Sequence, residues 1–172
     1  NTHDRKARKF AITTEIYPQW SDDAWRAYEE VYAQSWKGDE GCPAFLEALA
    51  RQQGAAGTLR LGIAQFEGRP VAAQLWTIDQ SGAIIHKLAY CEDAAHMSPG
   101  TILSAALFRH VIDEDCVRQI SYGTGDDRYK SDWMDQREQL NLIELWNPTY
   151  ISGLVGIAKL LTSRFINALK PQ

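Results

Sequence analysis

HMSPGTIL, residues 96–103, marks a helix that begins shortly after a strand, and this change of element points to the fold class. Ser98 is a favourable N-cap residue, and Pro99 at the first helical position gives up an N–H that no intrahelical acceptor could use. With Gly100 next, the first turn carries only small side chains, where free backbone donors and the helix dipole favour an anion. We therefore predict a helix from Ser98 to about Glu114, whose start either binds an anion or faces water as an ordinary capped helix.

Strands are expected on both sides of this helix. Segments 58–66, 71–78 and 83–91 have the apolar character of strands and are joined by two short turns, which predicts an antiparallel meander. Residues 117–123 predict another strand after the helix. The order strand, helix, strand then requires a parallel crossover, which is right-handed. Ligands of open α/β sheets bind beyond the carboxyl ends of parallel strands, where this helix begins.

The other segments predict a mixed α/β chain, in α+β style, with helices flanking the sheet. A short strand is expected at 8–15, and Ser21 caps a helix with aromatic residues at helical spacing. We assign core packing to those aromatic residues, Trp25, Tyr28, Tyr32 and Trp36. The further elements expected are a helix at 43–53, a loop and helix at 126–135, a strand at 139–146 and a last helix at 149–169.

Length and charge limit the function classes. The chain has 172 residues and 45% hydrophobic content, which fits one domain with one sizeable core. The 18 basic residues are outweighed by 22 acidic ones, and the net charge of -4 argues against DNA as a partner. The chain begins with Asn1, so we expect a processed protein or a part of a longer one. The basic residues Arg5, Lys6, Arg8 and Lys9 are interpreted as a solvated tail.

Cysteine usage and hydropathy bear on compartment and metals. Cys42, Cys91 and Cys116 are far apart and odd in number, so they predict neither a disulfide framework nor a zinc site. The four histidines have no metal-ligand spacing. We find no apolar run long enough to span a bilayer and no signal-peptide pattern. These features predict a cytoplasmic protein without a metal.

Four segments resemble one group of acyltransferases. They are SWKGDE (35–40), EGRPVAAQLW (67–76), HKLAYCEDAAHMSPGTIL (86–103) and YGTGDDRYKSDW (122–133). With the order of elements, they resemble the cellulose-biosynthesis-type acetyltransferases of the GNAT superfamily, which are related to the Fem aminoacyl transferases. The resemblance covers most of the chain. It implies a GNAT-like, mostly antiparallel sheet with one βαβ crossover at the cofactor site.

The resemblance implies that acetyl-CoA or another acyl-CoA is the donor. The last strand of the meander would offer backbone groups to the pantetheine arm, and the helix start would cradle the pyrophosphate, where Gly100 lets the backbone approach closely. The cofactor-binding residues implied are Leu88, Ala89, Tyr90, Ser98, Pro99, Gly100 and Thr101. The usual signature of the superfamily is Q/R-x-x-G-x-G/A, and aligned on Gly100 this chain has Met97 in place of Gln or Arg and Ile102 in place of the second small residue. Because of this departure, aminoacyl-tRNA, the donor of the Fem relatives, stays an alternative. The acidic balance argues against tRNA.

Catalytic candidates follow from the chemistry of acyl transfer, which needs a base for the amine and an acid for the leaving thiolate. Tyr129 lies where GNAT enzymes often have a tyrosine acid, so the resemblance assigns it as proton donor. Asp126 could activate the acceptor, and the neutral imidazole of His86 could act as a base. Each has a structural alternative: a packing tyrosine, a helix cap and a hydrogen-bonded strand histidine.

Substrate-binding candidates flank the same region. Trp36 could stack on a sugar or amine, although core burial is the favoured interpretation, and Lys37 belongs to the same matching segment. Lys130 could hold an anion or form a surface ion pair, and Glu92 could recognise a cationic acceptor or lie in a solvated turn. The full set of substrate-binding candidates is Trp36, Lys37, Glu92, Asp127 and Lys130.

The sequence therefore predicts an N-acyltransferase that moves an acyl group, with acetyl favoured, to an amine, with a hydroxyl as the less favoured acceptor. The resemblance suggests a small-molecule or sugar acceptor, such as an amino sugar of cell-surface polysaccharide metabolism. The alternatives are a Fem-type aminoacyl transferase and a non-catalytic domain for CoA sensing or pairing. The chain is expected to form a single GNAT-like domain over residues 1–172, with one half of a tandem protein or a homodimer as further arrangements.

Overall fold

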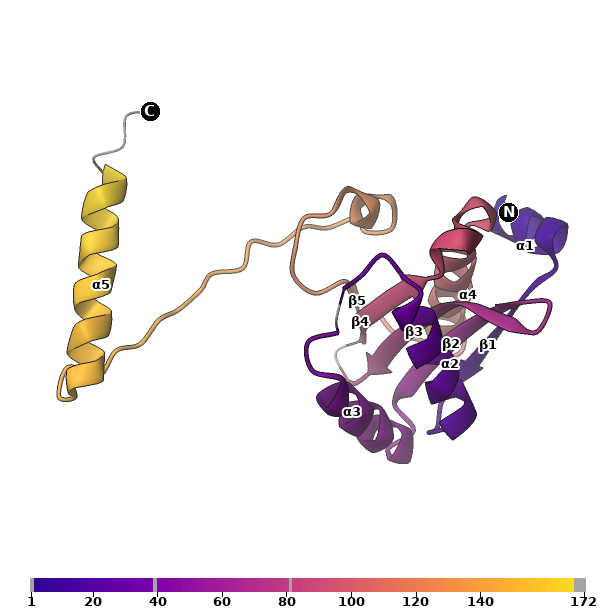
Figure 1. Cartoon of the computed structure of the whole chain (residues 1–172), viewed down its shortest axis with the longest axis horizontal. Coiled ribbons are helices and arrows are strands. Elements are labelled where there is room, and N and C mark those ends of the chain that lie inside the picture. The colour runs from indigo at the N-terminus through magenta and orange to yellow at the C-terminus, as the bar shows by residue number, and fades with distance from the viewer. Residues whose placement is uncertain (1, 39, 81, 169–172) are drawn as a thin grey trace. The chain divides into compact units, whose positions relative to one another are not determined.

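The computed structural model describes residues 2–38, 40–80 and 82–168 and divides into two compact units. The sheet unit comprises residues 1–126 and the C-terminal unit residues 127–172. Figure 1 shows the elements of each. The expectation of one domain, or of one half of a tandem protein, stays a prediction.

The sheet unit is built on a five-stranded sheet in the order β1-β2-β3-β4-β5. Its strands are β1 (Ile12–Tyr17), β2 (Leu59–Phe66), β3 (Arg69–Ile78), β4 (Ala83–Tyr90) and β5 (Ile120–Ser121). The first four pair antiparallel in sequence order, and β5 pairs parallel with β4. The predicted mostly antiparallel sheet with one crossover is confirmed. The strand expected at 117–123 is reduced to the two residues of β5.

Helices cover both faces of this sheet (Figure 1). They are α1 (Thr2–Phe10), α2 (Asp22–Ala33), α3 (Pro43–Ala55) and α4 (Pro99–Asp113), with the 3-10 helix η1 (Glu92–Met97) before α4. A Cβ added at Gly62 of β2 would lie 2.8 Å from Cδ1 of Leu107, so this glycine lets α4 approach the sheet closely. On the opposite face, Lys87 of β4 lies with its Nζ 5.6 Å from the centroid of the Tyr32 ring of α2.

The amino-terminal basic cluster lies in a helix, so it is not a tail, and the strand predicted at 8–15 begins only at Ile12. The side chains of Arg5, Arg8 and Lys9 are exposed, as expected of solvated residues, whereas Lys6 is half-buried. Ala7 and Phe10 of α1 pack against the core. Lys6 donates a hydrogen bond from Nζ to Oγ of Ser98, at 3.1 Å. The apolar residues of α1 pack against α4, which is distant in the sequence, so the local sequence pattern could not predict this helix.

The Ser21 helix forms as predicted, with Oγ of Ser21 accepting from the N–H of Ala24 at 3.3 Å. Trp25 and Tyr28 are buried, as expected of core residues. The assignment of Trp36 to the core is wrong, because its side chain is 47% exposed. The helix ends at Ala33, so helical spacing no longer predicts where Trp36 points.

The C-terminal unit contains the 3-10 helix η2 (Arg128–Asp132) and the helix α5 (Ile151–Ala168). The predicted strand at 139–146 is wrong: within the described part of the chain, these residues belong to no ladder, and Leu142 is 87% exposed. Alternating apolar residues make a strand only where a neighbouring strand supplies hydrogen-bond partners. The end of the last predicted helix, at residue 169, falls outside the described residues.

Hydropathy places no membrane span in the described residues: none of their helices is both long and apolar enough to cross a bilayer. The three cysteines are free, in agreement with the spacing argument against disulfides.

Candidate functional site

β4 and β5 are paired over a short distance only. The pairing joins Ala83 to Ile120 and Ile84 to Ser121, so residues 85–90 extend beyond it. Among the described residues, the ladder with β5 does not reach this part of β4. An extended ligand with amide groups could bind there as a strand binds a sheet edge.

A bulge bends β4 at the same point. Leu75 of β3 lies opposite Lys87 while Trp76 lies opposite Ile85, so His86 is the extra residue. Bulges disrupt the ladder, increase the local twist and recur next to active sites. The bulge therefore lies just beyond the pairing of β4 with β5, which ends at Ile84.

His86 is anchored within this bulge. Its Nε2 lies 2.8 Å from Oγ1 of Thr77, which agrees with the hydrogen-bonded structural alternative. Partial burial lowers the pKa of His86 below its ordinary value, so the imidazole is neutral near pH 7. A neutral imidazole is the form that can accept a proton.

The pH dependence of stability is expected to report this lowered pKa. As the pH falls, the unfolded chain protonates His86 before the folded chain does, so stability is lost below the ordinary pKa of about 6.5. The loss is complete once the pH has passed the lowered folded pKa. In the variant His86→Gln, the urea concentration at the unfolding midpoint should change less between about pH 7 and about pH 5 than in the unmodified chain. An NMR titration giving His86 a pKa at or above the ordinary value would contradict this.

Tyr90 ends β4 and joins two other segments. Its ring centroid lies 4.4 Å from that of Trp36, which follows α2. A Cβ added at Gly100 would lie 3.1 Å from Cδ1 of Tyr90, so the first turn of α4 also lies close to the Tyr90 ring. Lys37 places Nζ 5.6 Å from the centroid of the Trp36 ring. These residues, predicted from three separate segments, come together at one end of β4.

Leu88 and Ala89 precede Tyr90 on the same strand. Leu88 is partly buried opposite Gln74, and Ala89 is buried opposite Ala73. Their side chains therefore contribute to packing, and only their main-chain groups are suited to a ligand.

The start of α4 is bare, as its sequence predicts, although Ser98 acts differently from the expected cap. Ser98 is left-handed, with φ 58° and ψ 45°, and its side chain makes no cap hydrogen bond. Its carbonyl accepts from the N–H of Ile102 at 3.1 Å, and Pro99 is the first helical residue. The N–H groups of Gly100 and Thr101 lie in the first turn, where a helix has no acceptor for them.

Lys6 brings a cationic group to this helix start, through its hydrogen bond to Oγ of Ser98. Sequence reasoning missed it, because Lys6 and Ser98 are 92 residues apart. The basic cluster was the only sequence feature that pointed to Lys6, and it does not indicate which residue Lys6 contacts. A cation and free N–H groups at one place suit a phosphate.

Glu40 is a second residue that sequence reasoning did not single out, although it ends the matching segment 35–40. Its carboxylate accepts from the hydroxyl of Tyr28 and lies 3.9 Å from Nζ of Lys87, with 10% of the side chain exposed. Burial and this carboxylate raise the pKa of Tyr28. Glu40 thus ties the loop after α2 to β4.

Glu92 is exposed at the first position of η1, where its N–H donates to the carbonyl of Gln34 at 3.3 Å. Its neighbour Asp93 forms an ion pair with Arg69 at 2.8 Å. Glu92 is therefore accessible to a ligand, and its role in acceptor recognition stays a prediction.

The remaining candidates lie at or beyond the boundary of the sheet unit. Asp126 is its last residue and is exposed. Within the C-terminal unit, Asp127 pairs with Nζ of Lys130 at 3.3 Å, which is the ion pair considered as the alternative for Lys130. Burial, and then the Asp127 carboxylate, raise the pKa of Tyr129, so its phenol stays protonated at neutral pH. The catalytic roles of these residues stay predictions.

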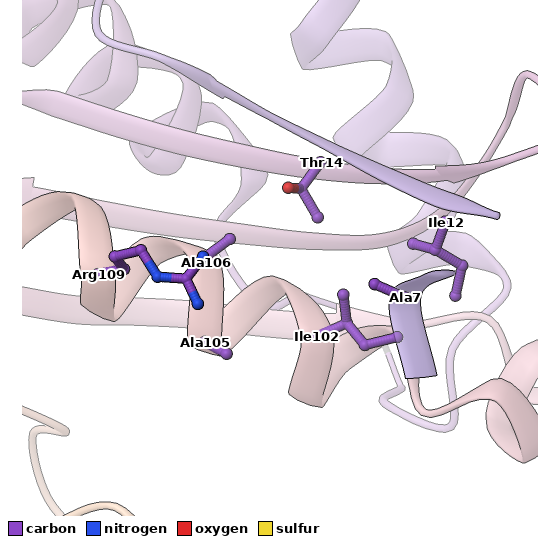
Figure 2. Close-up of a pocket in the computed structure, with 7 residues that line it drawn as sticks. All are labelled: Ala7, Ile12, Thr14, Ile102, Ala105, Ala106 and Arg109. Atoms are coloured by element: carbon purple, nitrogen blue, oxygen red, sulfur yellow. The ribbon is translucent and has the colours of Figure 1, made fainter. Parts of the chain in front are cut away.

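One small hollow lies elsewhere on the sheet unit, between α1, β1 and α4 (Figure 2). Its volume is about 70 Å³, and it is lined by Ala7, Ile12, Thr14, Ile102, Ala105, Ala106 and Arg109. Ligand pockets usually measure about 300–1,000 Å³, so this hollow cannot hold a nucleotide. None of the predicted site residues lines it.

Metal ligation finds no support in the part of the chain that is described, where no cluster of three or more His, Cys, Asp or Glu side chains could hold an ion.

Solved structures of similar fold are acetyltransferases. An aminoglycoside acetyltransferase from an uncultured soil metagenomic sample, in complex with sisomicin, matches with a TM-score of 0.56 and 14% identity, over 81% of this chain and 97% of that one. AAC(6')-Iy in complex with the bisubstrate analog CoA-S-monomethyl-acetylneamine matches with a TM-score of 0.57 and 12% identity, over 78% and 97%. A ribosomal-protein-alanine N-acetyltransferase from Brucella melitensis biovar Abortus 2308 matches with a TM-score of 0.54 and 10% identity, over 79% of this chain and 99% of that one. At these identities the similarity establishes the fold.

Curated protein sequences give no significant match to this chain. A family model described as an acetyltransferase (GNAT) domain matches residues 3–131, which include the whole sheet and the start of α4. GNAT acetyltransferases use acetyl-CoA as the donor. With the parallel strand β5, the bare start of α4 and this match, the chain belongs to the GNAT family of acyl-CoA-dependent acyltransferases.

Proposed function

We propose that this chain transfers an acetyl group from acetyl-CoA to the amine of an amino sugar in cell-surface polysaccharide metabolism. The observation that carries the donor part is the first turn of α4, where Gly100 and Thr101 offer N–H groups beside Lys6. The resemblance to cellulose-biosynthesis-type acetyltransferases supports the acceptor class. Two structures of similar fold, determined with sisomicin and with an acetylneamine analog, are compatible with an aminated sugar.

The donor would lie across β4 and α4. The pyrophosphate would accept from the N–H groups of Gly100 and Thr101 and pair with the ammonium of Lys6. Main-chain groups of residues 88–90 would bind the pantetheine amides, because this part of β4 extends beyond its pairing with β5. Pro99 and Ser98 would line the approach. The small side chains at the start of α4 would leave room for the pyrophosphate to reach the main-chain N–H groups.

The reaction requires two proton transfers. The amine nitrogen attacks the thioester carbonyl carbon, the carbon–sulfur bond breaks, and the thiolate leaves. Tyr129 would give its phenolic proton to this thiolate. Asp126 or the neutral imidazole of His86 would take the proton that the amine loses, directly or through water.

The acceptor would bind beside the exposed ring of Trp36. An aromatic face can stack on the apolar face of a sugar, and Trp36 already packs against Tyr90 at the end of β4. Lys37, Glu92, Asp127 and Lys130 are the polar groups proposed to orient the acceptor. Glu92 carries the charge that suits an ammonium group.

Calorimetric titration with CoA and acetyl-CoA tests the donor site without knowledge of the acceptor. We expect saturable binding of one molecule per chain. Salt should weaken this binding, because the proposed site pairs the charged pyrophosphate with the ammonium of Lys6. Absence of binding would contradict the proposal. That result would favour the Fem-type aminoacyl donor or the non-catalytic domain.

Release of free thiol from acetyl-CoA tests the acceptor. Glucosamine should support thiol release, whereas glucose, which has a hydroxyl in place of the amine, serves as the matched control. Equal release with both sugars would contradict transfer to an amine.

A further inference from the structure

Gln74 ties the first turn of α4 to the middle of the sheet. It lies on β3, is 1% exposed, and donates from Nε2 to the carbonyl oxygen of Gly100 at 3.1 Å. The same nitrogen donates to Oγ of Ser104 at 2.8 Å. Its Oε1 accepts from Nε1 of Trp76 at 2.9 Å. Both N–H groups and the oxygen of this buried amide therefore have hydrogen-bond partners.

The orientation of the Gln74 amide follows from its partners. An indole Nε1 can only donate and a backbone carbonyl can only accept, so Oε1 must face Trp76 and the NH₂ group must face Gly100. Trp76 is itself held against α4, since its ring lies edge-on to that of Phe108 with centroids 5.1 Å apart. The amide is thus fixed at both ends.

The bond from Gln74 to the Gly100 carbonyl adds to the helical hydrogen bonding that sets the direction of a neighbouring donor. The carbonyl of Gly100 and the N–H of Thr101 belong to one planar trans peptide and point in opposite directions. Holding the carbonyl toward Gln74 therefore directs the Thr101 N–H away from it, out of the start of α4. Hydrogen bonding to the carbonyl also polarises the peptide and strengthens its N–H as a donor.

We infer that Gln74 is a positioning residue for the acyl donor, acting through the Gly100–Thr101 peptide. The inference rests on the proposed binding of the CoA pyrophosphate at this helix start. Gln74 does not touch the donor. It holds the peptide whose N–H group binds the phosphate, so its removal should weaken donor binding without changing the chemical step.

The variant Gln74→Met tests this, because methionine keeps the length of the side chain and lacks both donors. We expect the Kd for CoA and the KM for acetyl-CoA to rise about threefold to tenfold, the usual effect of one hydrogen bond, with kcat unchanged. In ¹⁵N-labelled protein, the amide signal of Thr101 should shift less on adding CoA than in the unmodified chain. If the single variant unfolds, Gln74→Met combined with Trp76→Phe also removes the donor left unpaired on Trp76.

Ser104→Ala is the matched control, since it removes one bond of the same buried network and leaves the bond to Gly100. It should lower thermal stability and keep the Kd for CoA. An unchanged Kd in the folded Gln74 variant, or an equal rise in Ser104→Ala, would overturn the inference. Failure of the unmodified chain to bind CoA, or binding that leaves the Thr101 amide unshifted, would instead reject the proposed donor site itself.

Discussion

The variant Gly100→Leu is expected to lose CoA binding while keeping the fold of the sheet unit. A Cβ at this position already comes within 3.1 Å of Cδ1 of Tyr90, and the leucine side chain would cover the first-turn N–H groups. Each lost hydrogen bond to a charged phosphate is worth about 1.5–3 kcal/mol. We expect the Kd for CoA to rise at least about 100-fold, which corresponds to about 2.7 kcal/mol.

Calorimetry with CoA measures this effect, and circular dichroism verifies that the variant is folded. Gly100→Ala should give a smaller loss, because one methyl group requires Tyr90 to shift by only a few tenths of an ångström. Ala105→Leu adds the same side chain further along α4, beside the hollow of Figure 2, and controls for added bulk. CoA binding that survives in Gly100→Leu would show that the pyrophosphate binds elsewhere.

The variant Tyr129→Phe is expected to lower kcat by about 100-fold, since general acids contribute about 10²–10⁴-fold to rate. The raised pKa of Tyr129 keeps its phenol protonated at neutral pH, as an acid for the leaving thiolate requires. Phenylalanine keeps the ring and removes only this proton. The KM for acetyl-CoA should be unchanged, because the hydroxyl acts on the departing sulfur.

Steady-state thiol release measures kcat, and Tyr150→Phe provides the control. Tyr150 is also in the C-terminal unit and is 65% exposed, so its hydroxyl should not affect turnover. An unchanged kcat in Tyr129→Phe would remove Tyr129 as the acid. A rise in KM with constant kcat would make it a binding residue.

Much of the fold could be predicted from local pattern. The Ser21 cap, the meander and the helix beginning at Pro99 each follow from short-range chemistry: a capping hydroxyl, tight turns and a proline in the first helical turn. The parallel pairing of β5 with β4 then follows from the order of elements. The bare helix start on which the proposed donor site depends could be predicted for the same reason.

Residues that depend on distant partners could not be predicted. The basic cluster around Lys6 became part of a helix because α4 supplies its packing surface, and residues 139–146 lack a strand neighbour in the described part of the chain. Glu40 and Gln74 were not identified because a lone carboxylate or amide gives no local signal. Trp36 was assigned to the core because helical spacing was extended past the end of α2.

Residues close together in the chain set the order of elements, the bare start of α4 and the resemblance to the GNAT superfamily, so these features could be predicted from local pattern. Three contacts required the folded chain: Lys6 donates to Ser98, Tyr90 lies close to both Trp36 and Gly100, and Gln74 donates to the Gly100 carbonyl. The physical reason is that local propensity acts over a few residues. Hydrogen bonds and ring contacts between distant segments form only once the sheet has brought those segments together.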